Sequence, residues 1–369
     1  MHNLELAFGV NRSFSMRLAT AAALLILATP GRAQEAFDPQ ARVTEALQAV
    51  RPIAMNRDRV DWVAVERQAR ELAGPAKDTI DLLPAYHLIV WSLGDNHSLI
   101  LPTDGQVDEW IRRNGRDRYL PDTPRRRPSY SEYRRRPVSG RDLAMPNGRV
   151  ARTVVVPAFN GDDASNAFAQ SITDALRSSA EACGYVVDLR GNTGGNMFPM
   201  VTGLWPLLGD GFSFPGVSGP GLEDGRVSVE GGQLVGYAQP GAPGEAFNAL
   251  SSWTADRTIA NAPVAVLIDQ VVGSSGEGVA IALRGREQTR FFGERTYGVA
   301  SANTILTLSD GIGLAVTVAY LKDSQGRTYP DGIPPDEPVA TGPGSRTDPD
   351  DAVVEAAKAW LANDSSCAV

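Results

Sequence analysis

VAVLIDQVVGSSGEGVAIAL, residues 264–283, joins a short apolar run to a helix-like run through a turn of glycine and serine. The first run is rich in β-branched residues and predicts a buried strand, whereas the second run predicts a helix. An earlier region has the same order: residues 153–159 predict a strand, 163–180 an amphipathic helix, and 185–196 a strand that ends in glycines. Strands that alternate with helices predict an α/β fold with a parallel or mixed sheet.

The flanking segments indicate how the 369 residues are organised. Residues 61–74, DWVAVERQARELAG, space apolar side chains three and four apart and end at a glycine followed by proline, so they predict a helix. Residues 209–247 are rich in glycine and proline and predict a surface insertion. Residues 303–323 predict a hairpin that turns at 309–311.

We therefore predict five regions. They are a signal peptide (1–33), a small N-terminal helical domain (34–102), an arginine- and proline-rich connector (103–149), an α/β core (150–341) and a C-terminal helix with tail (342–369). The last helix is predicted to start with Asp348 as N-cap and Pro349 at its first position.

The first 33 residues have the features of a secretory signal. Arg12 and Arg17 lead into an apolar stretch, residues 18–28, which is followed by a helix-breaking Pro30 and small residues. A helix that spans a bilayer needs about 20 apolar residues, so this stretch is too short for a stable anchor. We predict an exported protein, periplasmic or secreted, without a transmembrane anchor in its mature form.

The charge balance is acidic, with a formal net charge of −8. The leader carries three arginines against one glutamate, so its removal gives −8 − 2 = −10, which argues against a nucleic-acid partner. Residues 112–136 are the local exception, with ten arginines and interleaved tyrosines. Two interpretations remain open for them: a patch for phosphates or an anionic envelope surface, and a solvated linker kept open by charge repulsion and prolines.

The chain has two cysteines, Cys183 and Cys367. Export would permit a disulfide between them, and two free thiols are the alternative. Two cysteines and two histidines outside the leader are too few to build a zinc site. We predict no metal and no other cofactor.

The turn between the strand and the helix places Ser274 and Ser275 where backbone N–H groups and the helix dipole favour negative charge. That environment suits a tetrahedral oxyanion, but a serine there can equally be a plain N-cap, and both interpretations remain open at this point. The nucleophile pattern Gly-x-Ser-x-Gly fails because residue 277 is glutamate. A Ser-x-x-Lys dyad is excluded because none of the three lysines lies three residues after a serine.

A base and an oxyanion hole have candidates elsewhere in the chain. His97 lies in a polar turn just past a helix-stopping glycine, whereas His87 lies inside an apolar helix and is predicted to be a core histidine. Gly194 and Gly195 end a buried strand and expose bare backbone N–H groups, which could form an oxyanion hole with the N–H of Ser275. A simple tight turn is the alternative for the two glycines.

Five motifs follow one another over about residues 150–341: YVVDLRGNTGG, VAVLIDQVVGSSGEGVAIAL, FFGERTYGVAS, LSDGIGLAVTVAYLKDSQGRTY and GIPPDEPV. In this order they resemble the C-terminal-processing, or tail-specific, serine proteases, and SLGDNHS extends the resemblance upstream. The resemblance implies a ClpP/crotonase-like ββα spiral core. It also implies that Ser274, three residues before Glu277, is the nucleophile.

Two departures from the family pattern matter. Many members use a lysine base in the turn that is here TYGVAS, and this chain has Val299 there. A branch that includes the tricorn core and a chlamydial protease resembles a Ser-His-Glu arrangement instead, and GDNHS matches it through His97. The acid of that branch is not matched; Asp331 is the nearest candidate, Asp336 is interpreted as a structural turn residue, and Glu277 is a further candidate partner.

These features predict an exported serine endopeptidase that hydrolyses protein or peptide substrates through an acyl-enzyme. No PDZ-like insert is evident, so recognition of a free C-terminus is not predicted. One rival is a peptide- or ligand-binding protein that kept the fold and lost turnover, motivated by the absent lysine and the unmatched acid. Another is an envelope-associated interaction protein that acts through residues 112–136.

Overall fold

The computed structural model describes most of the chain between residues 37 and 368. The described ranges are 37–116, 118–120, 136–161, 164–215, 217–219, 225–237, 243–254, 256–340 and 351–368. The predicted signal peptide and most of the arginine-rich segment lie outside these residues. Among the described residues, no helix combines the length and the apolar character needed to span a membrane.

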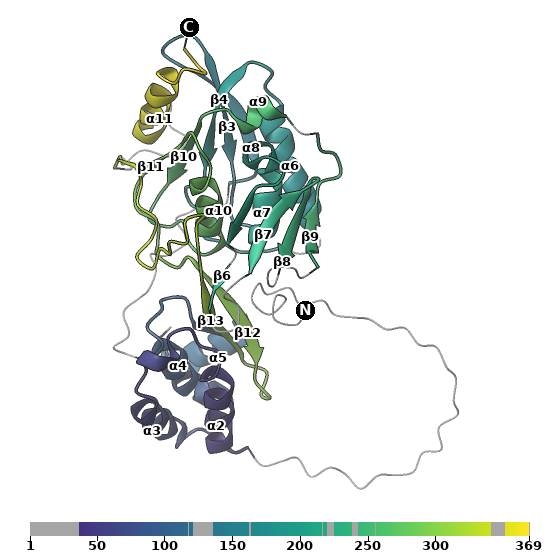
Figure 1. Cartoon of the computed structure of the whole chain (residues 1–369). Helices are drawn as coiled ribbons and strands as arrows, with labels where there is room; N and C mark the ends of the chain where they lie inside the picture. Colours follow the sequence, from purple (N-terminus) through teal and green to yellow (C-terminus); the bar gives the residue numbers. More distant parts are fainter. Residues whose placement is uncertain are drawn as a thin grey trace, which may run out of the picture.

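The N-terminal region is a small helical domain, seen at one end of the molecule in Figure 1. Its members are α2 (Pro39–Val50), η1 (Arg57–Arg59), α3 (Trp62–Ala73), η2 (Ile80–Leu82), α4 (Leu83–Trp91) and α5 (Asp104–Asn114). Helix α3 ends at Ala73 with Gly74 as its C-cap, as the glycine followed by proline predicted. Their apolar faces pack into one cluster that includes Leu47, Val65 and Tyr86.

The predicted connector over 103–149 is not a connector at its two ends. Helix α5 starts with a capping box between Thr103 and Gln106, and it buries Trp110 in the helical domain. Strand β2 (Ser139–Ala144) is the antiparallel edge strand of the central sheet. The prediction was wrong there because polar and arginine residues on the exposed faces of both elements dominate the composition.

The centre of the molecule is a six-stranded mixed sheet in the order β14-β11-β10-β4-β3-β2. Its other strands are β3 (Val150–Val155), β4 (Ala182–Asp188), β10 (Val264–Ile268), β11 (Thr289–Gly293) and β14 (Glu337–Pro338). All neighbouring pairs are parallel except β2 with β3. The predicted α/β alternation is thereby confirmed.

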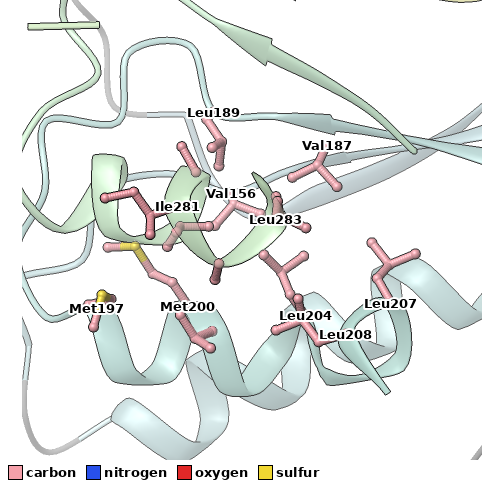
Figure 2. Packing of buried hydrophobic residues seen from close by; sticks show 14 of the residues in the cluster. Val156, Val187, Leu189, Met197, Met200, Leu204, Leu207, Leu208, Ile281 and Leu283 are labelled. Atoms are coloured by element: carbon pink, nitrogen blue, oxygen red, sulfur yellow. The ribbon is translucent and has the colours of Figure 1, made fainter. Parts of the chain in front are cut away.

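Helices cover both faces of this sheet. Successive strand residues point to opposite sides, so both faces carry apolar side chains that the helices bury. Val187 of β4 and Val266 of β10 pack against α6 (Ser165–Arg177), α7 (Met197–Gly203), α8 (Trp205–Leu208) and α10 (Ser275–Arg284). Figure 2 shows this layer, with Ile281 and Leu283 of α10 close to Met200 and Leu204. On the other face, Val186 and Leu267 pack against α11 (Ala352–Ala362).

A long hairpin links the two parts of the molecule (Figure 1). It consists of β12 (Ser301–Thr307) and β13 (Gly313–Leu321), which confirms the predicted hairpin and its turn. Strand β1 (Leu99–Leu101) of the N-terminal region pairs antiparallel with β13, and β6 (Val217–Ser218) pairs with the far end of β13. The segment that precedes β1 is therefore fixed to the core through the hairpin.

The segment predicted as a surface insertion is a further sheet. Strands β5 (Ser213–Pro215), β7 (Arg226–Glu230), β8 (Gln233–Tyr237) and β9 (Glu245–Ala249) pair in this order. Val227, Val229 and Leu234 are buried in the main core cluster. Glycine and proline in this region mark turns between short strands rather than a loose loop.

The C-terminal helix starts later than predicted. Asp351 is the N-cap of α11 and accepts hydrogen bonds from the N–H groups of Val353 and Val354, whereas Asp348 and Pro349 lie outside the described residues. The other Asp351 oxygen pairs with Arg190 at 2.6 Å. A disulfide joins Cys183 to Cys367 and fastens the chain end to the start of β4.

Candidate active site

Ser274 stands between β10 and α10 in a strained backbone conformation, with φ 52° and ψ −124°. A side chain with positive φ costs free energy, and such strain persists where the surrounding structure enforces it. The N-caps Asp38 and Asp351 have negative φ, as capping requires. Ser274 is the N-cap of α10 and forms a capping box with Glu277, but its positive φ distinguishes it from these two caps. Its backbone resembles that of a nucleophile held on a sharp strand-to-helix turn.

Glu277 holds this turn from inside the protein. Its carboxylate is fully buried and accepts four hydrogen bonds: from Ser274 N at 3.2 Å, Val299 N at 2.8 Å, Gly298 N at 2.9 Å and Thr296 Oγ1 at 2.5 Å. Burial raises the pKa of Glu277, and the hydrogen bonds oppose that shift. The carboxylate therefore ties the serine turn to residues 296–299.

The two glycines of the 185–196 motif lie directly against the serine turn, both with φ 108°. A Cβ on Gly194 would stand 2.8 Å from the Cβ of Ser274, and a Cβ on Gly195 would stand 2.0 Å from the carbonyl oxygen of Phe159. Ser275 Oγ donates a hydrogen bond to the Gly195 carbonyl. Only glycine permits both this backbone angle and this close approach.

The N–H groups in this region divide into used and open donors. The N–H of Gly194 donates to Asn192 Oδ1 at 3.0 Å, so it is not available to an oxyanion. Within the described part of the chain, the N–H groups of Gly195 and Ser275 donate no hydrogen bond. The predicted set of donors is therefore reduced from three residues to two, Gly195 and Ser275.

His97 is buried on the loop between α4 and β1. Asp95 Oδ1 accepts from the backbone N–H of His97 at 2.9 Å, and Asn303 Nδ2 donates to the His97 carbonyl at 3.1 Å. Nδ1 of His97 lies 2.7 Å from Oγ of Ser301, the first residue of β12. The loop is thus fixed by hydrogen bonds to the hairpin, and the ring orientation is set through Ser301.

No hydrogen bond joins Asp331, the predicted acid partner, to His97 among the described residues. Asp331 is exposed, its backbone packs against Gly298, and it makes no hydrogen bond among the described residues. Ser301 occupies the place beside Nδ1 that was predicted for an acid. Sequence reasoning missed Ser301 because nothing in its local sequence distinguishes it. Ser301 reaches His97 only because β13 pairs with β1 on one side and with β12 on the other.

The remaining predicted residues have structural roles. Asp336 accepts from Phe291 N at 2.8 Å and pairs with Arg284, which confirms its interpretation as a structural turn residue. His87 stacks on Trp91 in the helical domain, with ring centroids 5.7 Å apart.

A pocket that opens to solvent lies beside the serine turn. It is lined by Gly195, Asn196, Met197, Phe198, Ser275, Ser301, Ala302, Asn303 and Leu321. None of these side chains is charged. The neighbour of Ser274 and the partner of His97 therefore border one cavity, although they come from α10 and β12. No cluster of His, Cys, Asp or Glu suited to a metal ion occurs in the described ranges.

The fold agrees with the comparisons with known proteins. The chain belongs to peptidase family S41, whose model matches residues 153–339. A photosystem II D1 C-terminal processing protease has a similar structure, with a TM-score of 0.50, 18% identity, and 82% of this chain and 94% of that chain covered. The core is thus the α/β fold of this family, consistent with the ClpP/crotonase-like spiral that the motifs implied.

Individual relatives match a longer stretch of the chain than the family model does. The nisin-resistance protein of Lactococcus lactis is 29% identical over 294 residues, which cover 79% of this chain and 80% of that protein. A chloroplastic carboxyl-terminal-processing peptidase of Arabidopsis thaliana is 27% identical over 66% of this chain but only 42% of its own length. A lipoprotein from Streptococcus agalactiae shares the fold with a TM-score of 0.58 at 19% identity, over 92% of this chain and 99% of that chain.

Proposed function

We propose that this chain is an exported serine endopeptidase in which Ser274 is the nucleophile and His97 the general base. The observation that carries the proposal is the positive φ of Ser274 at the end of β10, supported from below by Glu277. Backbone strain of this kind clusters at active sites, where it helps to hold a reactive side chain in position.

The proposed reaction follows the logic of acyl transfer. His97 accepts the proton of Ser274 Oγ, and the oxygen attacks the carbonyl carbon of a peptide bond. The N–H groups of Gly195 and Ser275 donate to the oxyanion of the tetrahedral intermediate. The imidazolium then protonates the leaving amine, and a water molecule, activated by the same histidine, hydrolyses the acyl-enzyme.

Ser301 takes the role that an acid has in the related branch. Nδ1 of His97 is beside Ser301 Oγ, so Nε2 is the nitrogen assigned to the proton transfer with Ser274. A hydroxyl fixes the tautomer and the ring plane but stabilises the imidazolium less than a carboxylate does. Ser301 is therefore a positioning residue in this proposal.

Loss of the Ser301 hydroxyl is expected to affect turnover and not binding. Ser301→Ala should lower kcat about tenfold with KM unchanged, in line with the effect of removing a group that orients a functional histidine. Ser301→Thr keeps a hydroxyl and should retain most of the kcat. Equal losses in both variants, or a rise in KM alone, would contradict the positioning role.

Export and substrate class are part of the proposal. A signal-like leader and a disulfide between Cys183 and Cys367 suit an oxidising compartment outside the cytosol. The family is one of peptidases, and the uncharged pocket beside Ser275 suits a polypeptide segment without charged side chains at that point. Cleavage within an unfolded chain is proposed rather than selection of a free C-terminus.

Labelling with a fluorophosphonate probe tests the proposed nucleophile directly, because the probe reacts only with an activated serine. The wild-type protein is expected to label at Ser274, identified by peptide mapping, and His97→Ala should label far more slowly. An unlabelled, correctly folded wild-type protein would favour the alternative, a binding protein on the same fold without turnover.

A further inference from the structure

The hairpin that holds Ser301 has two faces of different character. Residues on one face of the paired strands, including Ile100 of β1 and Leu314 of β13, are buried in the helical domain. Successive side chains of a strand alternate between faces. The residues on either side of Ile100 in β1, and those on either side of the β12 partner of Leu314, therefore point to the opposite face. That second face is the subject of the inference.

The second face carries a row of exposed apolar side chains. The register aligns Leu99 with Ala315 and Ala315 with Ile305, so Leu99 and Ile305 flank a small residue on the middle strand. Leu101 lies over Gly313 in the next row. The exposed fractions are 40% for Leu99, 39% for Leu101 and 46% for Ile305, although β-strands usually bury such residues.

Chance scatter does not account for this row. Large hydrophobic side chains are exposed at six positions of the described chain, and three of the six gather on this one face. The other residues that the register places on it are uncharged: Thr307 is exposed, Asn303 is half-buried, and Ala315 and Thr317 are buried. An apolar, uncharged sheet face in contact with solvent marks a binding surface.

The face is continuous with the candidate active site. Ser301 and Asn303 line the pocket beside Ser275, and Ile305 follows Asn303 on the same side of β12. Ile305 lies two residues beyond Asn303, about 7 Å at the rise of a strand, on the far side of the register shift between Ala302 and Asn303. An extended substrate has the same rise, so a chain that occupies the pocket would reach this row a few residues away.

We propose that the sheet face formed by Leu99, Leu101 and Ile305 is an extended substrate-binding surface, which holds an apolar segment of an unfolded polypeptide while a bond several residues away lies at Ser274. The inference rests on the proposed function and specifies its substrate: a chain with an apolar stretch at a fixed distance from the cleavage point. It also gives the hairpin a role besides carrying Ser301.

Binding measurements in an inactive background test this surface. The probe is fluorescein-labelled α-lactalbumin, reduced and carboxymethylated so that it stays unfolded, and its Kd is measured by fluorescence anisotropy with Ser274→Ala protein. Adding Leu99→Thr, Leu101→Thr and Ile305→Thr together should weaken binding about tenfold or more, because apolar anchors dominate such interfaces. Threonine retains the strand preference of these positions.

The matched control is Val63→Thr, which alters an exposed apolar residue of α3 on the helical domain. It should leave the Kd unchanged. If the triple variant has a lowered melting temperature, Ile305→Thr alone serves, with an expected weakening of about threefold. Absence of probe binding by the parent, or equal Kd values for parent and face variants, would overturn the proposal.

The Kd measurements on the face variants and on the control need no turnover. Their result is therefore independent of the fluorophosphonate labelling test. A protein that fails to label at Ser274 but loses polypeptide binding in the face variants would keep the surface and lose the proposed mechanism. A protein that labels normally but binds the probe equally in all variants would keep the mechanism and lose the surface.

Discussion

Ser274→Ala is expected to lower kcat/KM for an unfolded protein substrate by about 10,000-fold or more, the loss seen when a serine nucleophile is removed from a catalytic unit. A φ of 52° strains the backbone of any residue other than glycine, and replacing serine by alanine does not add to that strain. The variant should therefore fold, and the loss should appear in kcat with substrate binding retained.

Ser275→Ala is the matched control for this prediction. Ser275 adds its backbone N–H to the oxyanion hole, and alanine keeps that N–H while losing the hydrogen bond from Oγ to the Gly195 carbonyl. We expect a loss of about tenfold or less, since only one neutral hydrogen bond beside the site is removed. Abolished hydrolysis in Ser275→Ala, with activity retained in Ser274→Ala, would show that the nucleophile is Ser275 and not Ser274.

Glu277→Gln is expected to destabilise the fold by about 2 to 6 kcal/mol, since each buried donor left unsatisfied costs about 1–3 kcal/mol. One Glu277 oxygen accepts from Thr296 Oγ1 and Gly298 N, and the other accepts from Ser274 N and Val299 N. Glutamine replaces one of these oxygens by an NH2 group. Because the NH2 group is itself a donor, the two donors that the oxygen satisfied lose their acceptor. Urea unfolding at neutral pH measures the loss of unfolding free energy, provided that the m-value of the variant equals that of the wild-type protein.

The control is Glu287→Gln, just beyond the C-terminus of α10. Glu287 is exposed and its carboxylate makes no hydrogen bond among the described residues, so its unfolding midpoint should match that of the wild-type protein. Glu277→Gln should also lose hydrolysis, because Ser274 and residues 296–299 are no longer tied together. Unfolding of Glu277→Gln at the wild-type urea concentration would show that the buried carboxylate does not hold the turn.

Much of the core was predictable from local patterns. Short periodicities of apolar residues encode the strand over 264–268 and the helices that follow both strands, and the structure contains them. The strand predicted over 153–159 is present as β3 but begins and ends earlier, at Val150 and Val155. The same holds for the hairpin over 303–323, where Asp310 and Gly311 mark the turn. Such signals are strong because each depends only on neighbours in the chain.

The predictions that were wrong concern segments whose partners are distant. Strand β2 reads as part of a polar connector, and it becomes a strand because β3 offers an edge to pair with. The glycine-rich segment before β10 becomes a sheet because Val227 and Val229 find the main core. Local composition cannot report a partner that only folding supplies.

The active-site candidates divide in the same way. The sequence by itself determined the peptidase core, the serine turn and the glycine turn, because each is a contiguous motif whose backbone conformation follows from strand, glycine and helix in succession. Only the tertiary structure decided that Ser301 and not Asp331 stands beside His97, that Glu277 supports the turn, and that Gly194 has no N–H to offer. These outcomes depend on distances between side chains from separate strands, which are set by sheet register and packing rather than by any local run of residues.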